Sequence, residues 1–164
     1  MKIESLQDLF AHELKDLYSA EKQLLKGLEK MSSSASHEAL RAAFEQHMKE
    51  TEAHVERIEK IMSGMDNAPH GERCDAMEGL IEEAEEALES TENGDVRDAA
   101  MIGAAQRVEH YEIAAYGTAR TYARMLGNDE AERLLSQTLD EEKATDAKLT
   151  DLAEEMVNWD AFQR

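Results

Sequence analysis

The segment from Gln106 to Tyr116 places two carboxylates where a helix normally buries aliphatic side chains. Apolar residues recur along it at alternating steps of three and four, which is the period of a helix with one buried face. Glu109 and Glu112 fall on that face. A buried carboxylate costs several kcal/mol unless a positive group compensates it. The pattern therefore predicts a lysine, an arginine or a metal ion opposite the two acids.

The composition favours long helices. The chain of 164 residues contains one Pro and 8 Gly, and its 41% hydrophobic content is enough for a continuous core. We expect a single all-α domain over residues 1–164. Its helices are predicted at about 5–31, 36–65, 75–90, 95–126 and 129–156, and the predicted N-caps are Ser5, Ser36, Asp95 and Asn128.

The lengths of the connections predict the topology. A short link at 32–36 joins the first two long helices as an antiparallel hairpin. The stretch from Gly64 to Gly94 is too long for a tight turn, and it contains the short helix at 75–90. If it carries the chain back across the bundle, the first and last long helices run one way and the other two run the opposite way. The prediction is a four-helix bundle with a long crossover that carries an extra short helix.

Each long helix also has one acid near its middle, on or beside the apolar face. These acids are Glu21, Glu50, Glu112 and Glu142. The two pairs are separated by 29 and 30 positions, so both hairpins present their acids at nearly the same level. Glu21 alone could be explained by a side chain that reaches water or a nearby lysine. Four acids at one level instead predict a dinuclear carboxylate centre.

The predicted topology adds further candidates. His47, Glu109 and Asp146 lie toward one end of this level, and we interpret them as additional ligands or as supporting contacts. His54 points toward the opposite end and is interpreted as structural. A site rich in oxygen suits two iron ions, with manganese as the alternative, better than zinc. The competing explanation is an acid cluster that shares protons or pairs with Arg107, Arg120 or Lys143.

The charge and the cysteine content restrict the possible partners. The formal net charge is −19, so the surface repels phosphate backbones and anionic lipid, and we expect neither nucleic acid nor a membrane as a partner. Cys74 is the lone cysteine and cannot form an internal disulfide. With no signal peptide and no long apolar run, a cytoplasmic location is expected.

Several segments closely resemble the bacterial YciE/YciF family. They are LYSAEKQLL at 17–25, FEQHMKET at 44–51, CDAMEGLIEE at 74–83, AAQRVEHYEIAAYG at 104–117 and TLDEEKATDAKLTDL at 138–152. The resemblance implies a ferritin-like four-helix fold, a dimetal centre that is expected to be di-iron, a homodimer and a loose association with stress responses. It does not imply an established reaction.

One difference from the wider ferritin-like pattern affects the function. The usual Glu-x-x-His pairs are absent, because the residue three positions after Glu50 is Ala53 and the residue three positions after Glu142 is Thr145. Ferroxidase or oxygenase activity therefore cannot simply be carried over. Two hypotheses remain open: a metal centre that reacts with oxygen or peroxide, and a structural protein in which the centre only stabilises the bundle. Iron storage in a shell of many subunits is a weaker third hypothesis.

Overall fold

The computed structural model describes residues 2–65 and 72–163. Its four long helices are α1 (Leu6–Ser34), α2 (Glu38–Ser63), α4 (Asp95–Met125) and α5 (Asp129–Leu152). A shorter helix, α3 (Asp75–Ser90), lies in the crossover and packs against α1 and α4. The chain ends in a π-helical segment, η1 (Ala153–Val157), and a short helix, α6 (Asn158–Phe162). The predicted all-α bundle with an extra crossover helix is confirmed.

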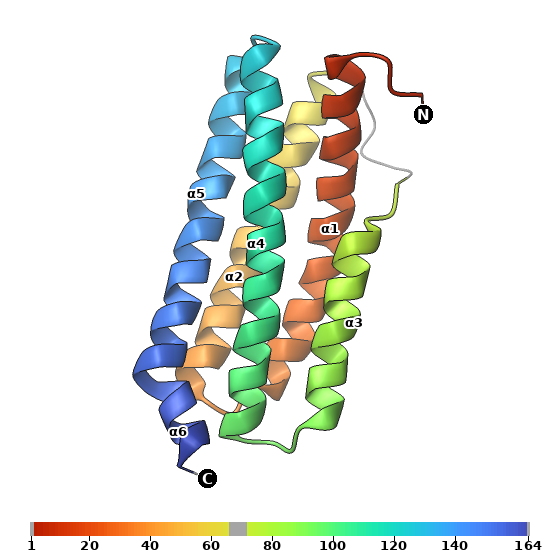
Figure 1. Cartoon of the computed structure of the whole chain (residues 1–164). Helices are drawn as coiled ribbons and strands as arrows, with labels where there is room; N and C mark the ends of the chain where they lie inside the picture. The colour runs from red at the N-terminus through yellow and green to blue at the C-terminus, as the bar shows by residue number, and fades with distance from the viewer. Residues whose placement is uncertain (1, 66–71, 164) are drawn as a thin grey trace.

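Figure 1 shows the direction of each long helix. α1 and α5 run downward in this view, whereas α2 and α4 run upward. Neighbouring helices around the bundle are α1 with α2, α2 with α5, α5 with α4, and α4 with α1. This is the arrangement that the length of the crossover predicts. None of the helices in the described part of the chain is long and apolar enough to cross a membrane.

Two of the predicted helix caps are confirmed. The Ser5 hydroxyl accepts a hydrogen bond from the Asp8 N–H at 3.1 Å, which caps α1. The Asn128 side chain accepts from the Ala131 N–H at 3.0 Å, which caps α5. Between α4 and α5, Gly127 has a φ of 71°, a left-handed conformation that glycine adopts without steric cost. These signals are local, so the sequence reveals them.

The predicted caps of the other two helices are wrong. α4 begins at Asp95 itself, and Gly94 is its N-cap. α2 begins after His37, not at Ser36, and no side-chain cap is formed by His37. The start of α2 is instead held by Asp98 of α4, whose carboxylate accepts from the Ser36 N–H at 3.0 Å and from the His37 N–H at 2.7 Å. Asp98 lies far from these partners in sequence, so spacing along one helix could not reveal it.

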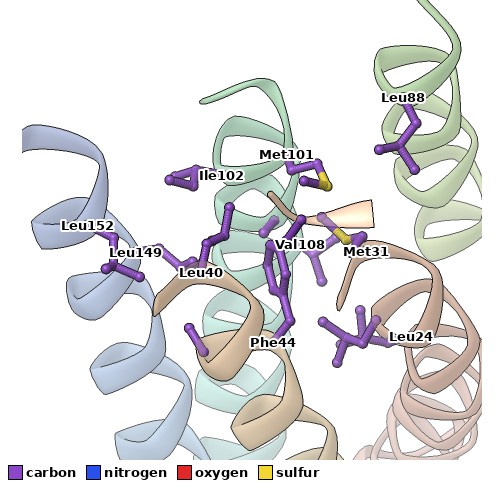
Figure 2. Close-up of a cluster of buried hydrophobic side chains, with 14 of the residues drawn as sticks. Leu24, Met31, Leu40, Phe44, Leu88, Met101, Ile102, Val108, Leu149 and Leu152 are labelled. Atoms are coloured by element: carbon purple, nitrogen blue, oxygen red, sulfur yellow. The ribbon is translucent and has the colours of Figure 1, made fainter. Parts of the chain in front are cut away.

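Among the described residues, the hydrophobic core forms two clusters. Figure 2 shows the first, which includes Leu24, Met31, Leu40, Phe44, Leu149 and Leu152. The second lies toward the other end of the bundle and includes Phe10, Leu14, Leu17, Ile58, Ile61 and Leu135. Along α1, Glu21 separates Leu17 of one cluster from Leu24 of the other. A polar layer therefore divides the core at the level that the sequence predicts.

Asp98 gives the first prediction. Its carboxylate is fully buried and accepts two backbone N–H bonds, so Asp98→Ala would leave both donors without a partner. We expect the free energy of unfolding to fall by about 2–3 kcal/mol. Urea denaturation measures this change. The exposed Asp140→Ala variant on α5 is the control, and an equal loss in both variants would contradict the role of Asp98.

Candidate metal centre

The polar layer is built from carboxylates and imidazoles on all four long helices. Its members are Glu21 on α1, His47 and His54 on α2, Glu109 and Glu112 on α4, and Glu142 on α5. None of these residues is more than 2% exposed. Each lies on the face of its helix that packs into the bundle, which is why the fold buries them despite their polarity.

The layer contains two groups whose ligand atoms lie within 4.8 Å of one another. The first group is His47, Glu109, Glu112 and Glu142, and the second is Glu21, His54 and Glu142. Glu142 belongs to both groups. A carboxylate with two oxygens can bind one ion with each of them, so this arrangement suits two neighbouring ions with Glu142 between them.

The polar atoms of the first group lie close together, but several of its carboxylate oxygens make no hydrogen bond. His47 Nδ1 lies 3.1 Å from Glu109 Oε1, and His47 Nε2 lies 3.5 Å from Glu142 Oε2. Both oxygens of Glu112 are buried and have no hydrogen-bond partner. The polar atoms of this group thus face one another without pairing fully.

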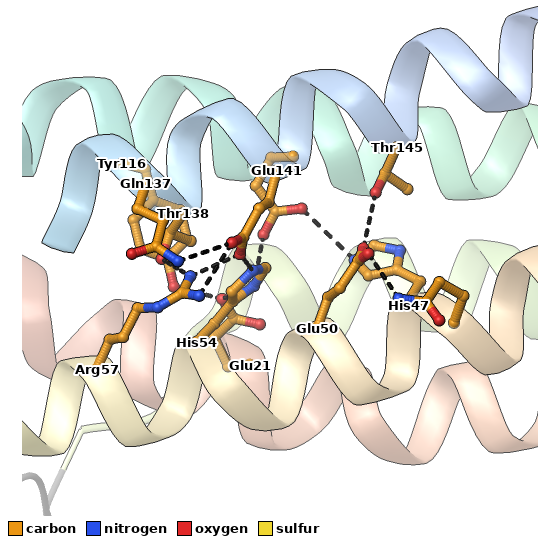
Figure 3. Close-up of polar contacts among 12 residues, drawn as sticks. Glu21, His47, Glu50, His54, Arg57, Tyr116, Gln137, Thr138, Glu141 and Thr145 are labelled. Atoms are coloured by element: carbon orange, nitrogen blue, oxygen red, sulfur yellow. Dashed lines mark hydrogen bonds and ion pairs between the residues drawn. The ribbon is translucent and has the colours of Figure 1, made fainter.

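The second group is centred on His54. Its Nδ1 lies 3.2 Å from Glu21 Oε1 and 2.9 Å from Glu142 Oε1. Tyr116, which is fully buried, donates its hydroxyl to the same oxygen of Glu21. On the other side of the ring, His54 Nε2 lies 2.9 Å from Glu141 Oε2 (Figure 3).

The contacts of Glu141 indicate how the His54 ring is oriented. Arg57 donates to both oxygens of Glu141, at 2.6 and 2.9 Å, and also to the Thr138 hydroxyl at 3.0 Å. A carboxylate so held favours a proton on His54 Nε2, which leaves Nδ1 as an acceptor. Nδ1 would then direct a lone pair at two carboxylates. This geometry is unfavourable unless a cation lies between them or the ring takes up a second proton.

Buried atoms that make no hydrogen bond are concentrated in this layer, although some of them lie within ion-pair distance of one another. They include both oxygens of Glu112 and of Glu142, one oxygen each of Glu21 and Glu109, and one nitrogen each of His47 and His54. Buried polar atoms almost always find a partner, so such a concentration indicates that a positive group, either a cation or protons taken up by the acids, belongs among them. The basic residues of the competing explanation do not supply it. Arg107 and Lys143 are exposed and Arg120 is half-buried, and among the described residues the cluster's ion pairs are with histidines.

The pKa shifts indicate which groups of the layer are protonated when no metal ion is bound. Burial raises the pKa of Glu109 to about 8, although His47 opposes this shift. Burial and then the charges of Glu142 and Glu21 raise the pKa of Glu112 well above its usual value. Burial lowers the pKa of His54, but Glu142 and Glu21 outweigh it and raise the value to about 10. The metal-free layer therefore keeps protons at neutral pH, and cations would displace them.

Five of the seven residues that the sequence predicts as ligands meet in this layer: Glu21, His47, Glu109, Glu112 and Glu142. The other two lie outside both groups. Glu50 is half-buried and accepts from Gln46 at 2.9 Å and from Thr145 at 3.4 Å. Asp146 accepts from Gln106 and lies 3.1 Å from His110 Nε2.

The expected positions of Glu50 and Asp146 differ from the observed ones because both residues lie beside the inward face of their helices. On α2, the inward face at this level carries His47, Thr51 and His54. α2 therefore contributes His47 and His54 to the layer, whereas His47 and Glu50 were expected.

The sequence interpretation also missed two contributors. His54, interpreted as structural, lies inside the second group, and Glu141 contacts its ring. His47 and His54 are seven positions apart, which places them on the same helix face two turns apart. That spacing was a signal available for His54. Glu141 had no such signal, since its role depends on Arg57 of a neighbouring helix.

The fold and the buried layer define an all-helical bundle protein with a carboxylate and histidine core. Residues 5–162 match the family described as "Domain of unknown function (DUF892)", and the chain belongs to this family. It is 53% identical over 159 residues to Protein YciF of Escherichia coli (strain K12), covering 96% of both chains. The predicted membership of the YciE/YciF family is thus confirmed.

Solved structures agree with this assignment. The crystal structure of the E. coli stress protein YciF matches with a TM-score of 0.91 and 52% identity, over 95% of this chain and 99% of that one. YcfI from Rhodopseudomonas palustris, whose description proposes a structural role, matches with a TM-score of 0.86 and 41% identity over 91% and 95%. A protein from Xanthomonas campestris, at 19% identity and a TM-score of 0.80 over 97% and 98%, shares the fold alone.

The pKa shifts predict how pH affects the metal-free protein. His54, whose pKa is raised from 6.5 to about 10, stabilises the fold fully below pH 6.5, and this contribution is lost as the pH rises through 10. Glu109, whose pKa is raised from 4.5 to about 8, lowers stability progressively over that interval. Both effects have the same sign between pH 6.5 and 8. We expect the free energy of unfolding to decline from pH 6.5 to 10, by about 2 kcal/mol or more.

Urea denaturation of chelator-treated protein at pH 6.5, 8 and 10 checks this decline. Protein loaded with metal serves as the control and should depend less on pH, since bound ions replace the protons. If the metal-free protein is equally stable at all three pH values, the layer contains no groups with shifted pKa values.

Proposed function

We propose that this protein binds two metal ions in the core of a ferritin-like bundle. His47, Glu109 and Glu112 would hold one ion, Glu21 and His54 would hold the other, and Glu142 would bridge them. The proposal is supported by the two groups of potential ligands that share Glu142. The single observation that carries it is the concentration in this one layer of buried oxygens and nitrogens that make no hydrogen bond.

The donor chemistry favours iron, with manganese as the alternative. The proposed ligands are four carboxylates and two imidazoles, a set that suits these ions. Zinc is less suitable because it favours a closed tetrahedral site rich in Cys and His. A pair of such ions, when bound, supplies electrons for reaction with oxygen or peroxide.

The chain's own residues would prepare the site for this chemistry. Arg57 and Glu141 orient the His54 ring, and the Tyr116 hydroxyl holds one oxygen of Glu21. The hydrophobic clusters on either side exclude bulk water, which strengthens electrostatic interactions within the layer. A role in the stress response, a homodimer and a cytoplasmic location complete the proposal. They are supported by the similarity to the E. coli stress protein and by the family resemblance.

The second candidate function is structural. Here the ions, or protons shared among the acids, only stabilise the bundle. The structural role proposed for the Rhodopseudomonas palustris relative favours this candidate. It requires the same buried layer but no reaction with an oxidant.

Metal analysis of protein purified without added chelator tests the proposed centre. We expect about two equivalents of iron or manganese per chain. Glu142→Ala removes the shared carboxylate and should reduce the content below one equivalent, whereas Glu52→Gln, on the exposed side of α2, should leave it unchanged. Absence of metal from the wild-type protein after controlled reloading would refute the centre and favour proton sharing.

Activity of the loaded protein separates the two candidate functions. The rates of peroxide consumption and of ferrous iron oxidation should be at least tenfold higher for the wild type than for the Glu21→Ala/Glu112→Ala variant, a difference equivalent to about 1.4 kcal/mol in activation free energy. The variant loses one ligand from each group. Equal rates in a wild-type protein that holds metal would leave only the structural role.

A further inference from the structure

A cavity of about 150 Å³ lies between α2 and α5, directly beside the buried layer. The small side chains of Ala43, Ala144 and Thr145 line it, which is why the two helices leave space there. His47 forms part of its wall and also belongs to the first group of potential ligands. Its lining also includes the exposed Ala144 and Lys148, so the cavity extends from beside the buried layer toward the surface between these helices.

The proposed centre needs such a connection. Its potential ligands are at most 2% exposed, so an ion cannot reach them from solvent without passing between helices. The cavity volume corresponds to roughly five water molecules at about 30 Å³ each. It can therefore accommodate a partly hydrated ion. His47, whose Nε2 lacks a hydrogen-bond partner, belongs both to the wall of the cavity and to the first group of potential ligands.

Glu50 lies in the wall of this cavity. Figure 3 places it on α2, beside His47 and facing Thr145 of α5. Its hydrogen-bond donors are Gln46, at 2.9 Å, and Thr145, at 3.4 Å. Both donors are neutral, so they leave the charge of the carboxylate uncompensated. The half-buried Glu50 can therefore attract a cation more strongly than an exposed acid can.

We infer that divalent cations enter the centre through this cavity and that Glu50 is the first carboxylate to bind them. The inference rests on the proposed metal centre and assigns Glu50 a role in uptake in place of the ligand role expected from the sequence. An ion held by Glu50 is one helical turn from His47, which lies three positions earlier on the same helix. The net charge of −19 raises the local concentration of cations around the entrance.

Lys148 also lines the cavity and carries the opposite charge. It is exposed, and its long side chain can move into solvent while an ion passes. Glu141, the partner of His54, is a further lining residue, and its charge is compensated by Arg57. Glu50 is thus the lining carboxylate with the least compensated charge.

The test is the rate of metal uptake, measured independently of any reaction of the loaded protein. Chelator-treated protein is mixed in a stopped-flow instrument with cobalt(II), and a fluorescent metal indicator follows the free ion. We expect Glu50→Gln to slow uptake about tenfold and to weaken its dependence on ionic strength, with the final stoichiometry unchanged. Ala144 lines the cavity at an exposed position, so Ala144→Trp should fill part of the cavity. This variant should slow both metal uptake and metal removal by chelator.

Glu52→Gln is the matched control, because Glu52 is exposed on the same helix and does not line the cavity. Its uptake rate should equal that of the wild type. Wild-type uptake rates in both Glu50→Gln and Ala144→Trp would overturn the entry path while leaving the centre intact. A lower stoichiometry in Glu50→Gln without slower uptake would make Glu50 a resident ligand and also overturn it. A wild-type protein that takes up no cobalt would instead refute the centre itself.

Discussion

The structure depends on a buried layer in which carboxyl groups outnumber the basic groups that face them. Glu21, Glu109, Glu112 and Glu142 are each at most 1% exposed, and the groups facing them are mainly two histidines. Replacing buried charged groups with well-packed aliphatic side chains is often neutral or stabilising. Since the layer interrupts an otherwise continuous core, we account for it by the metal ions that we propose it binds.

The two hydrophobic clusters and the polar layer have complementary roles. The clusters fix the spacing and register of four long helices, so side chains from helices far apart in sequence meet within a few ångströms. They also keep bulk water away from the carboxylates, which strengthens the attraction between the carboxylates and a bound cation. Contacts beyond the layer, namely those of Glu141 with Arg57 and with His54, orient the His54 ring from outside the layer. Stability of the bundle and preparation of the site are therefore linked.

Helix periodicity carried most of the information available in the sequence. It located the long helices and the level of the acids, and it placed Glu109, Glu112, Glu21 and Glu142 on inward faces. Periodicity was less informative for residues that lie beside the inward face. Glu50 was predicted as a ligand because it lies at the level of the other acids, although its direction around α2 places it beside the inward face. Contacts between helices, such as Asp98 with the start of α2, have no local pattern and require the folded chain.

Anomalous X-ray scattering from crystals loaded with manganese or iron tests the central claim most directly. Our account predicts two peaks inside the bundle, one beside His47 and Glu112 and the other beside His54 and Glu21, with an oxygen of Glu142 bound to each. Peaks confined to exposed carboxylates, with Glu112 and Glu142 free of metal, would contradict it.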